Sequence, residues 1–519
     1  MENRNVSRGE RDEELLTRAM QSWQGAQEFR DRRDRCKRMT YGNQWGDLVS
    51  ESGYSQDEAE YMRAHGYTPL TNNLIRRLVR NVLGVFRNRW REPVCRARDI
   101  RERSQAETMQ KLLICNSESN RLAELHARTF EEFLISGMAV HKKWFGPRNG
   151  VSDCQTDMVS PSRFFIDSEA RDVRGGDVTM LGEIHELSFE QLCASFATSP
   201  GECRRLMEIY GVASSEPHSR RCRVMEVWEK SYPERYVCRD RRTGRVFRAD
   251  ERGIVEVERE NRHRLRATAG NPARDPGLIE SKWRLESEWR YSFLTPQGDV
   301  LGNGVSPYAH GEHPYVWKAY PFIDGEVHSF VYDVIDQQKL TNRLVTMYDW
   351  MVRTSAKGAL LLPEDAIPHG VNPAEVAEQW RRFEGVILYR HHTGNPIPQQ
   401  IYSKGSNSGL TELLELQMKL MEDVSGVNGA LQGKLASGSI SGTLFNQQTQ
   451  NSLSALSDIL ESYDDFILRG TEKDADNIRQ FYPESRIAAI VGNHPGAVTR
   501  FIPTPGFFHT PFDFSFRQE

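Results

Sequence analysis

The sequence predicts a mixed α+β protein in which helices dominate and strands are confined to a few regions. Long stretches carry apolar residues at three- and four-residue steps, which is the spacing of one helix face. Between Arg220 and Gly304, short runs rich in β-forming residues instead alternate with turns. A smaller set of short apolar runs lies at 358–405, between two helical stretches. These observations predict helices around two β-containing regions.

The composition excludes several classes of protein. The 519 residues are 38% hydrophobic, enough for about two to four domains. A net charge of −4 argues against a protein that coats nucleic acid, so any DNA contact is expected to be local. No apolar run approaches the ~18 residues that span a bilayer, and Met1–Glu14 is unlike a signal peptide. We therefore expect a soluble protein. The eight cysteines form no CxxC pair, which favours reduced thiols over a zinc ribbon.

The N-terminal region begins with a charged amphipathic helix at 10–40, which ends at a turn at 41–47. Trp45 in this turn is expected to be a packing anchor. Thr71-Asn72-Asn73 offers a cap for a second helix, which carries six arginines and no acids between Thr71 and Arg91. Its basic stripe includes Arg76, Arg77, Arg80 and Arg87. Such a stripe can bind phosphate, but we favour pairing with carboxylates of the chain or of a neighbouring subunit.

The middle of the chain alternates between helices and strands. The predicted elements are a helix at 104–136, a strand at 137–145, a strand and turn at 160–172, and helical structure at 188–210. The β region at 220–304 follows, in which we interpret IVEVERE (254–260) as a strand. Residues 313–330 are predicted to be an extended link rich in proline and aromatic residues.

The C-terminal region centres on two long helical segments and a loop. A helix is predicted at 331–355, followed by a compact α/β unit with strands at 358–363, 384–390 and 399–403 and a short helix from Pro373. Helical periodicity then runs from Leu410 to Val424, stops in a loop rich in glycine and serine at 425–442, and resumes through Ile467. The last residues, 506–519, alternate like a strand.

The loop and the start of the following helix are almost uncharged. Lys434 is the only charged residue between Val424 and Ser457. One interpretation is an ordinary surface loop before an amide-rich helix. The other is a surface that touches a charged polymer without gripping it, because each Lys or Arg on a phosphate adds salt-dependent affinity. The residues alone leave both open.

No catalytic signature is present. The sequence lacks GxxxxGK[ST], GxSxG and HExxH motifs. The Asp464-Asp465 pair lies in a predicted helix and is interpreted as a solvated face. His391-His392 lacks further ligands at metal-binding spacing, so we interpret it as loop polarity. We therefore predict no catalytic residues, no cofactor and no metal.

Several pieces, in this order, resemble the portal proteins of tailed bacteriophages, in particular the P22-like branch of short-tailed phages. They are YGNQW (41–45), TNNLIRRLVRNVLG through RNRWREP (71–93), SPSRFFIDSEARD (160–172), DQQKLTNRL (336–344) and VSGVNGALQGKLASGSISG (424–442) with the glutamine-rich helix after it. Each piece has low specificity, and their order has more.

The resemblance implies a mostly helical portal fold, assembled as a ring of twelve subunits that forms a channel at one capsid vertex for DNA packaging and ejection. Its implied parts are a wing at 1–330 (β-rich at about 220–304), a stem helix at 331–357, an α/β clip at 358–408, a second stem helix at 409–424, a tunnel loop at 425–442, a long helix at 443–480, and a wing return or a short or truncated crown at 481–519.

The resemblance also implies partners and contact residues. The channel would pass double-stranded DNA without sequence specificity, past the tunnel-loop residues Asn428, Gln432, Lys434, Ser437, Ser439 and Ser441. The clip would dock the terminase large subunit and a head–tail adaptor protein through Glu375, Gln379, Arg381, Arg382, His391 and His392. Major capsid and scaffolding proteins are the other implied partners, and no membrane is implied. The implied location is the portal vertex of the virion, after assembly in the host cytoplasm.

Two alternatives to a portal remain. The first is a metal-dependent nuclease that processes DNA, with a carboxylate cluster such as Asp464-Asp465 at its centre. The second is a tail-adaptor or other structural interaction protein without a channel.

Overall fold

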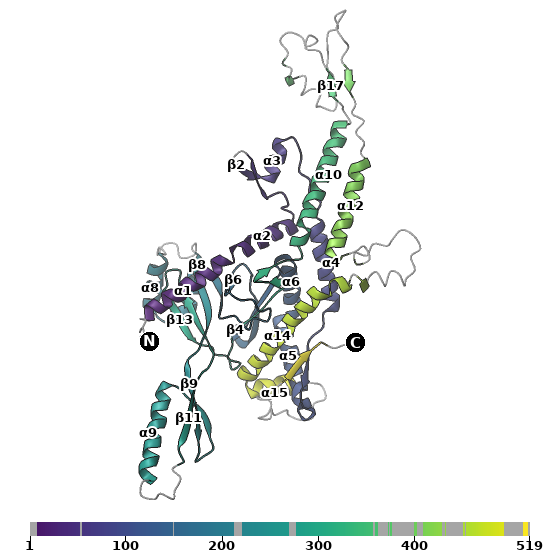
Figure 1. The fold of residues 1–519 in the computed structure, drawn as a ribbon. Helices are drawn as coiled ribbons and strands as arrows, with labels where there is room; N and C mark the ends of the chain where they lie inside the picture. The colour runs from purple at the N-terminus through teal and green to yellow at the C-terminus, as the bar shows by residue number, and fades with distance from the viewer. Residues whose placement is uncertain are drawn as a thin grey trace, which may run out of the picture. The chain divides into compact units, whose positions relative to one another are not determined.

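A computed structural model describes most of the chain and divides it into two compact units. The described residues are 8–51, 54–148, 150–211, 221–268, 277–355, 359–361, 372, 374–375, 399–401, 408–427, 431, 450–451, 453–492 and 512–516. The first unit contains 1–34, 82–330 and 453–519, and the second contains 35–81 and 331–452. The fold is mixed α+β, as predicted (Figure 1). The units do not follow the boundaries of the implied portal parts, which stay predictions.

Two antiparallel sheets form the centre of the first unit. The five-stranded sheet has the order β13-β12-β8-β7-β6 and consists of β6 (Phe164–Ile166), β7 (Met180–Ser188), β8 (Arg221–Ser231), β12 (Glu288–Leu294) and β13 (Val300–Val305). The three-stranded sheet has the order β14-β4-β5 and consists of β4 (Met138–Arg148), β5 (Val151–Met158) and β14 (Tyr315–Ala319).

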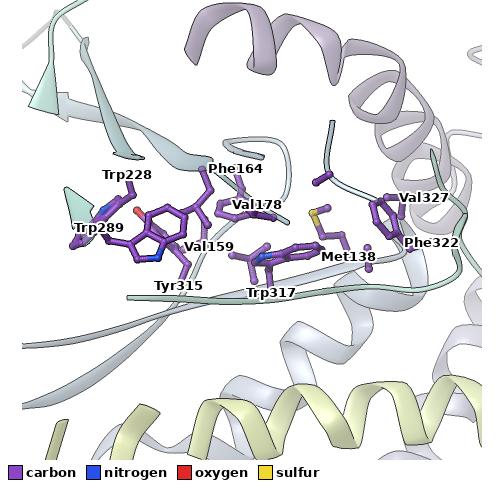
Figure 2. Close-up of a cluster of buried hydrophobic side chains, with 14 residues drawn as sticks. Met138, Val159, Phe164, Val178, Trp228, Trp289, Tyr315, Trp317, Phe322 and Val327 are labelled. Atoms are coloured by element: carbon purple, nitrogen blue, oxygen red, sulfur yellow. The ribbon is translucent and has the colours of Figure 1, made fainter. Parts of the chain in front are cut away.

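The main hydrophobic core contains side chains from both sheets. Met138 of β4 and Trp317 of β14 come from the smaller sheet, and Trp228 of β8 and Trp289 of β12 come from the larger one. Figure 2 shows the two tryptophans of the larger sheet at one end of the cluster and Phe322 at the other. Aromatic side chains bury large apolar areas, so this cluster accounts for much of the attraction between the sheets.

Helices cover the outer face of each sheet. On the larger sheet, Leu15 and Ala19 of α1 pack with Met225 and Val227 on the outer face. Two short helices pack on the other face, against Cys222 and Val224 of β8. On the smaller sheet, three helices pack against β4, β5 and β14. The bounds are α1 (Arg8–Gly25), α7 (Phe189–Phe196), α8 (Pro200–Tyr210), α5 (Arg103–Asn120), α6 (Leu122–Ser136) and α14 (Ser457–Phe481). The unit is thus layered as helix, sheet, sheet and helix.

One glycine is required where α6 turns into β4. Gly137 has φ +79°, a left-handed conformation that L side chains rarely adopt. A Cβ atom built there would lie 1.9 Å from the carbonyl oxygen of His328. The turn between helix and strand therefore depends on a residue without a side chain.

The prediction of a strand at IVEVERE (254–260) is wrong. These residues belong to α9 (Glu251–Thr268), which packs on a small sheet of order β10-β9-β11, with β9 (Glu234–Asp240), β10 (Val246–Ala249) and β11 (Ile279–Leu285). Ile254 and Val257, three residues apart, both contribute to the cluster on this sheet. Asp250 caps the helix by accepting a hydrogen bond from Gly253 N at 2.8 Å. One-sided burial and a cap outweigh the β propensity of the valines.

The prediction that 313–330 is a link is also incomplete. The segment is extended, but Tyr315–Ala319 is β14, whose five residues are all buried, and β15 (Phe322–Ile323) pairs with β16 (Glu326–Val327).

Three predicted helices prove to be interrupted. Residues 10–40 form α1 and α2 (Gln27–Tyr41), 104–136 breaks at Arg121 (φ +51°), and 188–210 forms α7 and α8.

The C-terminal segment of the first unit returns to its N-terminal half. The predicted strand is confirmed as β19 (Phe512–Ser515), which pairs with β3 (Val94–Ala97). Nearby, α15 (Glu484–Gly492) packs against α5, which follows the short 3₁₀ helix Ile100–Glu102. A second core of apolar side chains, including Met109 and Ile478, joins these elements to α14.

Four histidines in the first unit are shielded from water and favour the neutral form: His126 and His141 are buried, and His310 and His313 are partly buried. Burial lowers the pKa of His126, His141 and His313 well below its usual value and that of His310 to about 4. His141 Nε2 lies 2.7 Å from Thr129 Oγ1, so the ring is both buried and hydrogen-bonded.

These histidines predict that the protein loses stability in mild acid. Below pH ~6.5 the unfolded chain takes up protons that the folded chain does not, so the free energy of unfolding falls by about 1.4 kcal/mol per pH unit for each such histidine. The loss should start near pH 6.5 and continue down to the folded-state pKa. Thermal unfolding between pH 8 and 5 should show it. His141→Gln should reduce the slope, whereas the exposed His263→Gln should not. Equal slopes in wild type and His141→Gln would contradict this explanation.

The second unit is built around two long helices. They are α10 (Ile335–Ser355), preceded by a 3₁₀ turn at Tyr332–Val334, and α12 (Ser408–Ser425), which pack side by side (Figure 1). Both confirm predicted helices. The smaller elements are the hairpin β1 (Leu48–Glu51) and β2 (Tyr54–Asp57), α3 (Glu58–Ala64), the first half of α4 (Leu74–Arg89), and the paired strands β17 (Ala359–Leu361) and β18 (Gln399–Ile401). The strand predicted at 384–390 lies outside the described residues.

Candidate functional site

The buried face of α10 is polar. Gln338, Asn342 and Thr346 are at most 1% exposed and lie four residues apart, which aligns them along one side of the helix. Trp45, confirmed as a packing anchor, is 7% exposed in the same unit and donates a hydrogen bond from Nε1 to Leu70 O at 3.2 Å.

This polar row binds the backbone of residues 70–75 and the start of α4. Gln338 Oε1 accepts hydrogen bonds from Leu74 N (2.9 Å) and Ile75 N (3.1 Å), which are unpaired donors at a helix N-terminus. Asn342 Oδ1 accepts from Asn72 N at 3.0 Å. Asn73 Oδ1 accepts from Arg76 N, which confirms the predicted cap of α4. Gln338 of α10 therefore provides a second cap for the N-terminus of α4, in addition to Asn73.

Loss of the Gln338 amide should loosen the second unit. Gln338→Ala leaves two backbone donors and the Asn72 carbonyl without this partner, which should lower the free energy of unfolding by about 1–3 kcal/mol. Denaturant unfolding would measure the change. Gln337→Ala is the matched control, because Gln337 Oε1 has no hydrogen-bond partner in the described part of the chain. Equal effects of the two substitutions would contradict the capping role.

An ion-pair network strengthens the same face of α10. Lys339 Nζ lies 2.9 Å from both Asp47 Oδ2 and Glu58 Oε2, and Arg343 lies 2.6 Å from Glu58 Oε1. Burial alone would raise the pKa of Asp47, but hydrogen bonds from Arg35 and Lys339 lower it. Charges that are paired in this way hold residues 35–58 against α10.

The outer faces of α10 and α12 are unusually apolar. On α10, five large apolar side chains are 38–44% exposed: Leu340, Met347, Tyr348, Trp350 and Val352. On α12, five more are 37–49% exposed: Leu413, Leu416, Met418, Leu420 and Val424. We call these ten residues the apolar hairpin surface. A helix pair that buries polar groups and exposes apolar ones is typical of a surface that another chain covers.

The basic stripe lies on α4. Arg77, Arg80 and Arg87 are exposed, whereas Arg76 is half-buried with its guanidinium 4.8 Å from the centre of the Tyr41 ring. Within the described ranges, Arg77, Arg80 and Arg87 form no ion pair. The pairing with carboxylates of the same chain that the sequence favoured is therefore not seen for these three.

Most of the other predicted site residues lie outside the described residues. These are all six tunnel-loop residues (Asn428, Gln432, Lys434, Ser437, Ser439, Ser441) and five of the six clip residues (Gln379, Arg381, Arg382, His391, His392). Glu375 is described; it is exposed, and its backbone N donates to Asn372 O at 2.9 Å. Their roles stay predictions.

The Asp464-Asp465 pair does not form a carboxylate site. Asp464 is half-buried and Asp465 is exposed, and Asp465 Oδ2 accepts a hydrogen bond from Lys318 Nζ at 2.8 Å. Consecutive helical residues point in different directions, so the two carboxylates do not converge. A two-metal nuclease needs converging carboxylates.

The polar row of α10 and the exposure of the hairpin were not predicted from the sequence. A signal for the row was present, because Gln338, Asn342 and Thr346 recur at helical spacing. No sequence signal marks the apolar residues of the two helices as exposed, since a buried face has the same periodicity. No helix in the described ranges is long and apolar enough to cross a membrane.

Comparison with known proteins identifies the family. No curated protein matches the chain. A family model described as "Phage P22-like portal protein" matches residues 16–502, which is nearly the whole sequence. That family consists of structural, non-enzymatic proteins that act in phage DNA packaging as oligomeric rings. The chain therefore belongs to the phage P22-like portal protein family.

Proposed function

We propose that twelve copies of this chain form a ring at a unique capsid vertex, and that DNA enters during packaging and leaves during ejection through its central channel. Membership of the portal family supports the role, and the apolar hairpin surface supports the ring. In a ring, each subunit covers a surface of its neighbour, which would remove these apolar side chains from water. The hairpin surface is the single structural observation that carries the proposal.

In this proposal α10 and α12 are the two stem helices. The α/β clip at 358–408 docks the terminase large subunit and later the head–tail adaptor, and residues 425–442 form the tunnel loop. Major capsid and scaffolding proteins contact the ring during assembly. The exposed arginines of α4 contact a neighbouring subunit or DNA phosphate. Arg77, Arg80 and Arg87 form no ion pair in the described part of the chain, and carboxylates of another subunit or phosphates of DNA would supply the negative partner.

Native mass measurement together with negative-stain imaging tests the ring. We expect particles with a central hole and a mass near twelve times 59.7 kDa. If the purified chain is monomeric, the measurement is repeated with scaffolding and capsid proteins present. Absence of rings under both conditions would contradict the proposal.

The tunnel loop is tested by adding positive charge. The double substitution Ser437→Arg and Ser439→Arg should leave rings intact and impair DNA packaging, because each arginine on a phosphate adds salt-dependent affinity. Lys434→Ala tests the opposite change at the one charged position of the loop. Packaging by rings of each variant is compared in a DNA-protection assay, with Ser437→Ala plus Ser439→Ala as the matched control. Packaging by the arginine variant at the control level would remove the tunnel-loop assignment.

A further inference from the structure

Three potential ligands lie together on the inner face of the five-stranded sheet. Glu183 and His185 are two residues apart on β7, so their side chains lie on the same face. Glu226 of β8 pairs directly with Glu183 in the sheet register. One ligand atom from each of the three residues lies within 4.8 Å of the others. Like charges directly opposite each other destabilise a sheet, so this pair requires compensation.

Glu226 is compensated within the protein. Lys142 Nζ lies 2.5 Å from its Oε2, and Trp228 donates a hydrogen bond to its Oε1 at 2.8 Å. Both oxygens of Glu226 therefore have a partner within the protein. His185 Nε2 lies 2.7 Å from Oε2 of Glu226. A carboxylate that is paired with a lysine accepts hydrogen bonds, so His185 donates from Nε2 to Glu226.

Glu183 has no such compensation. Its Oε2 accepts one long hydrogen bond, from the Tyr315 hydroxyl at 3.5 Å. Its Oε1 faces His185 Nδ1 at 3.9 Å, which is too long for a hydrogen bond. Neither Oε1 of Glu183 nor Nδ1 of His185 has another hydrogen-bond partner in the described part of the chain. Both residues line a cavity of about 510 Å³, together with Lys142 and Glu226.

We propose that Glu183 Oε1 and His185 Nδ1 bind a divalent transition-metal ion at the wall of this cavity. The two ligand atoms lie 3.9 Å apart, slightly more than the ~3.4 Å that a tetrahedral ion with ligand distances of about 2.0–2.2 Å requires, so a small rotation of the Glu183 side chain brings both within reach of one ion. Imidazole and carboxylate ligands suit Zn²⁺, Co²⁺ or Ni²⁺ better than Mg²⁺ or Ca²⁺. Water from the cavity completes the coordination.

Glu226 is the positioning residue of this site. A metal-binding histidine commonly donates its other ring N–H to a carboxylate, which fixes the tautomer and orients the free nitrogen toward the ion. The Glu226–His185 hydrogen bond has this arrangement. Lys142 pairs with Glu226, so Glu183 Oε1 is left for the ion. The rival explanation is a protonated His185 that lies between two carboxylates and binds no metal.

Co²⁺ titration of the chelator-treated full-length chain tests the site. Visible d–d absorption reports nitrogen and oxygen ligands, whereas near-ultraviolet thiolate-to-cobalt bands would report the free cysteines. We expect one Co²⁺ per chain, visible bands without thiolate bands, and a rise in the melting temperature on binding. Glu183→Gln and His185→Ala should each weaken binding at least ~10-fold, and Glu226→Gln should weaken it ~10–100-fold.

A matched control is available in the same unit. His328 Nε2 also lies 3.9 Å from a glutamate oxygen, of Glu326, but both side chains are exposed and have no buried orienting carboxylate. His328→Ala should leave Co²⁺ binding unchanged. Circular dichroism of each variant checks folding, and the nearly isosteric Glu183→Gln keeps the test decisive if His185→Ala does not fold. The proposal is overturned if wild type binds no Co²⁺, if only thiolate bands appear, or if Glu183→Gln binds as tightly as wild type.

Discussion

Leu416→Glu and Met347→Glu are each expected to abolish ring formation while the subunit stays folded. Both side chains belong to the apolar hairpin surface, where Leu416 is 49% and Met347 is 44% exposed. A charge there costs little in the monomer because water reaches it. In the ring, the same charge would be buried without a partner, at a cost of about 3–5 kcal/mol per interface, or roughly 100-fold or more in each association step.

Native mass measurement and size-exclusion chromatography would show the effect as a shift from rings to monomers. Leu416→Met and Met347→Leu are the matched controls, because they keep the apolar character and approximate volume of each site. The controls should assemble, and circular dichroism should show all four variants folded. Wild-type rings from both glutamate variants would place the hairpin surface outside the subunit interface, and another surface would then have to hold the ring together.

Asp474→Ala is expected to destabilise the first unit strongly, by about 3–5 kcal/mol. Asp474 Oδ2 lies 2.5 Å from Lys143 Nζ, and the two side chains are only 5% and 2% exposed. The pair joins α14 to β4 behind the three-stranded sheet. Removing the carboxylate leaves a buried ammonium with Thr156 Oγ1, at 3.0 Å, as its remaining hydrogen-bond partner in the described part of the chain.

A second ion pair on the same helix provides the control. Lys318 and Asp465 also join α14 to the three-stranded sheet, at 2.8 Å, but Asp465 is 50% exposed. Asp465→Ala should cost less than Asp474→Ala, because water reaches the Asp465 carboxylate and screens the pair. The double variant Lys143→Met with Asp474→Leu should recover most of the stability lost in Asp474→Ala, since no charge is left buried. Denaturant unfolding of the four proteins measures these differences. Equal losses for Asp474→Ala and Asp465→Ala would contradict the argument.

The sequence by itself determined most of the helices and the order of the main parts. Apolar spacing of three and four residues predicted α4, α10, α12 and α14, because the periodicity of a helix with one buried face is written directly in the chain. The Asn73 cap and the packing role of Trp45 were also predicted from local sequence, and both are confirmed. The resemblance to P22-like portal proteins came from the order of short pieces spread over the chain.

The tertiary structure alone decided what each face contacts. The valines of 254–260 have β propensity, yet the small sheet beside them offers a surface for one helix face, and a helix forms. The sequence of 313–330 favours an extended conformation whether the segment is a link or a strand. Pairing with β4 makes part of it a buried strand. The Glu183, His185 and Glu226 cluster likewise depends on the register between β7 and β8. Periodicity fixes which residues share a face, but long-range packing decides whether that face meets the core, another subunit or water.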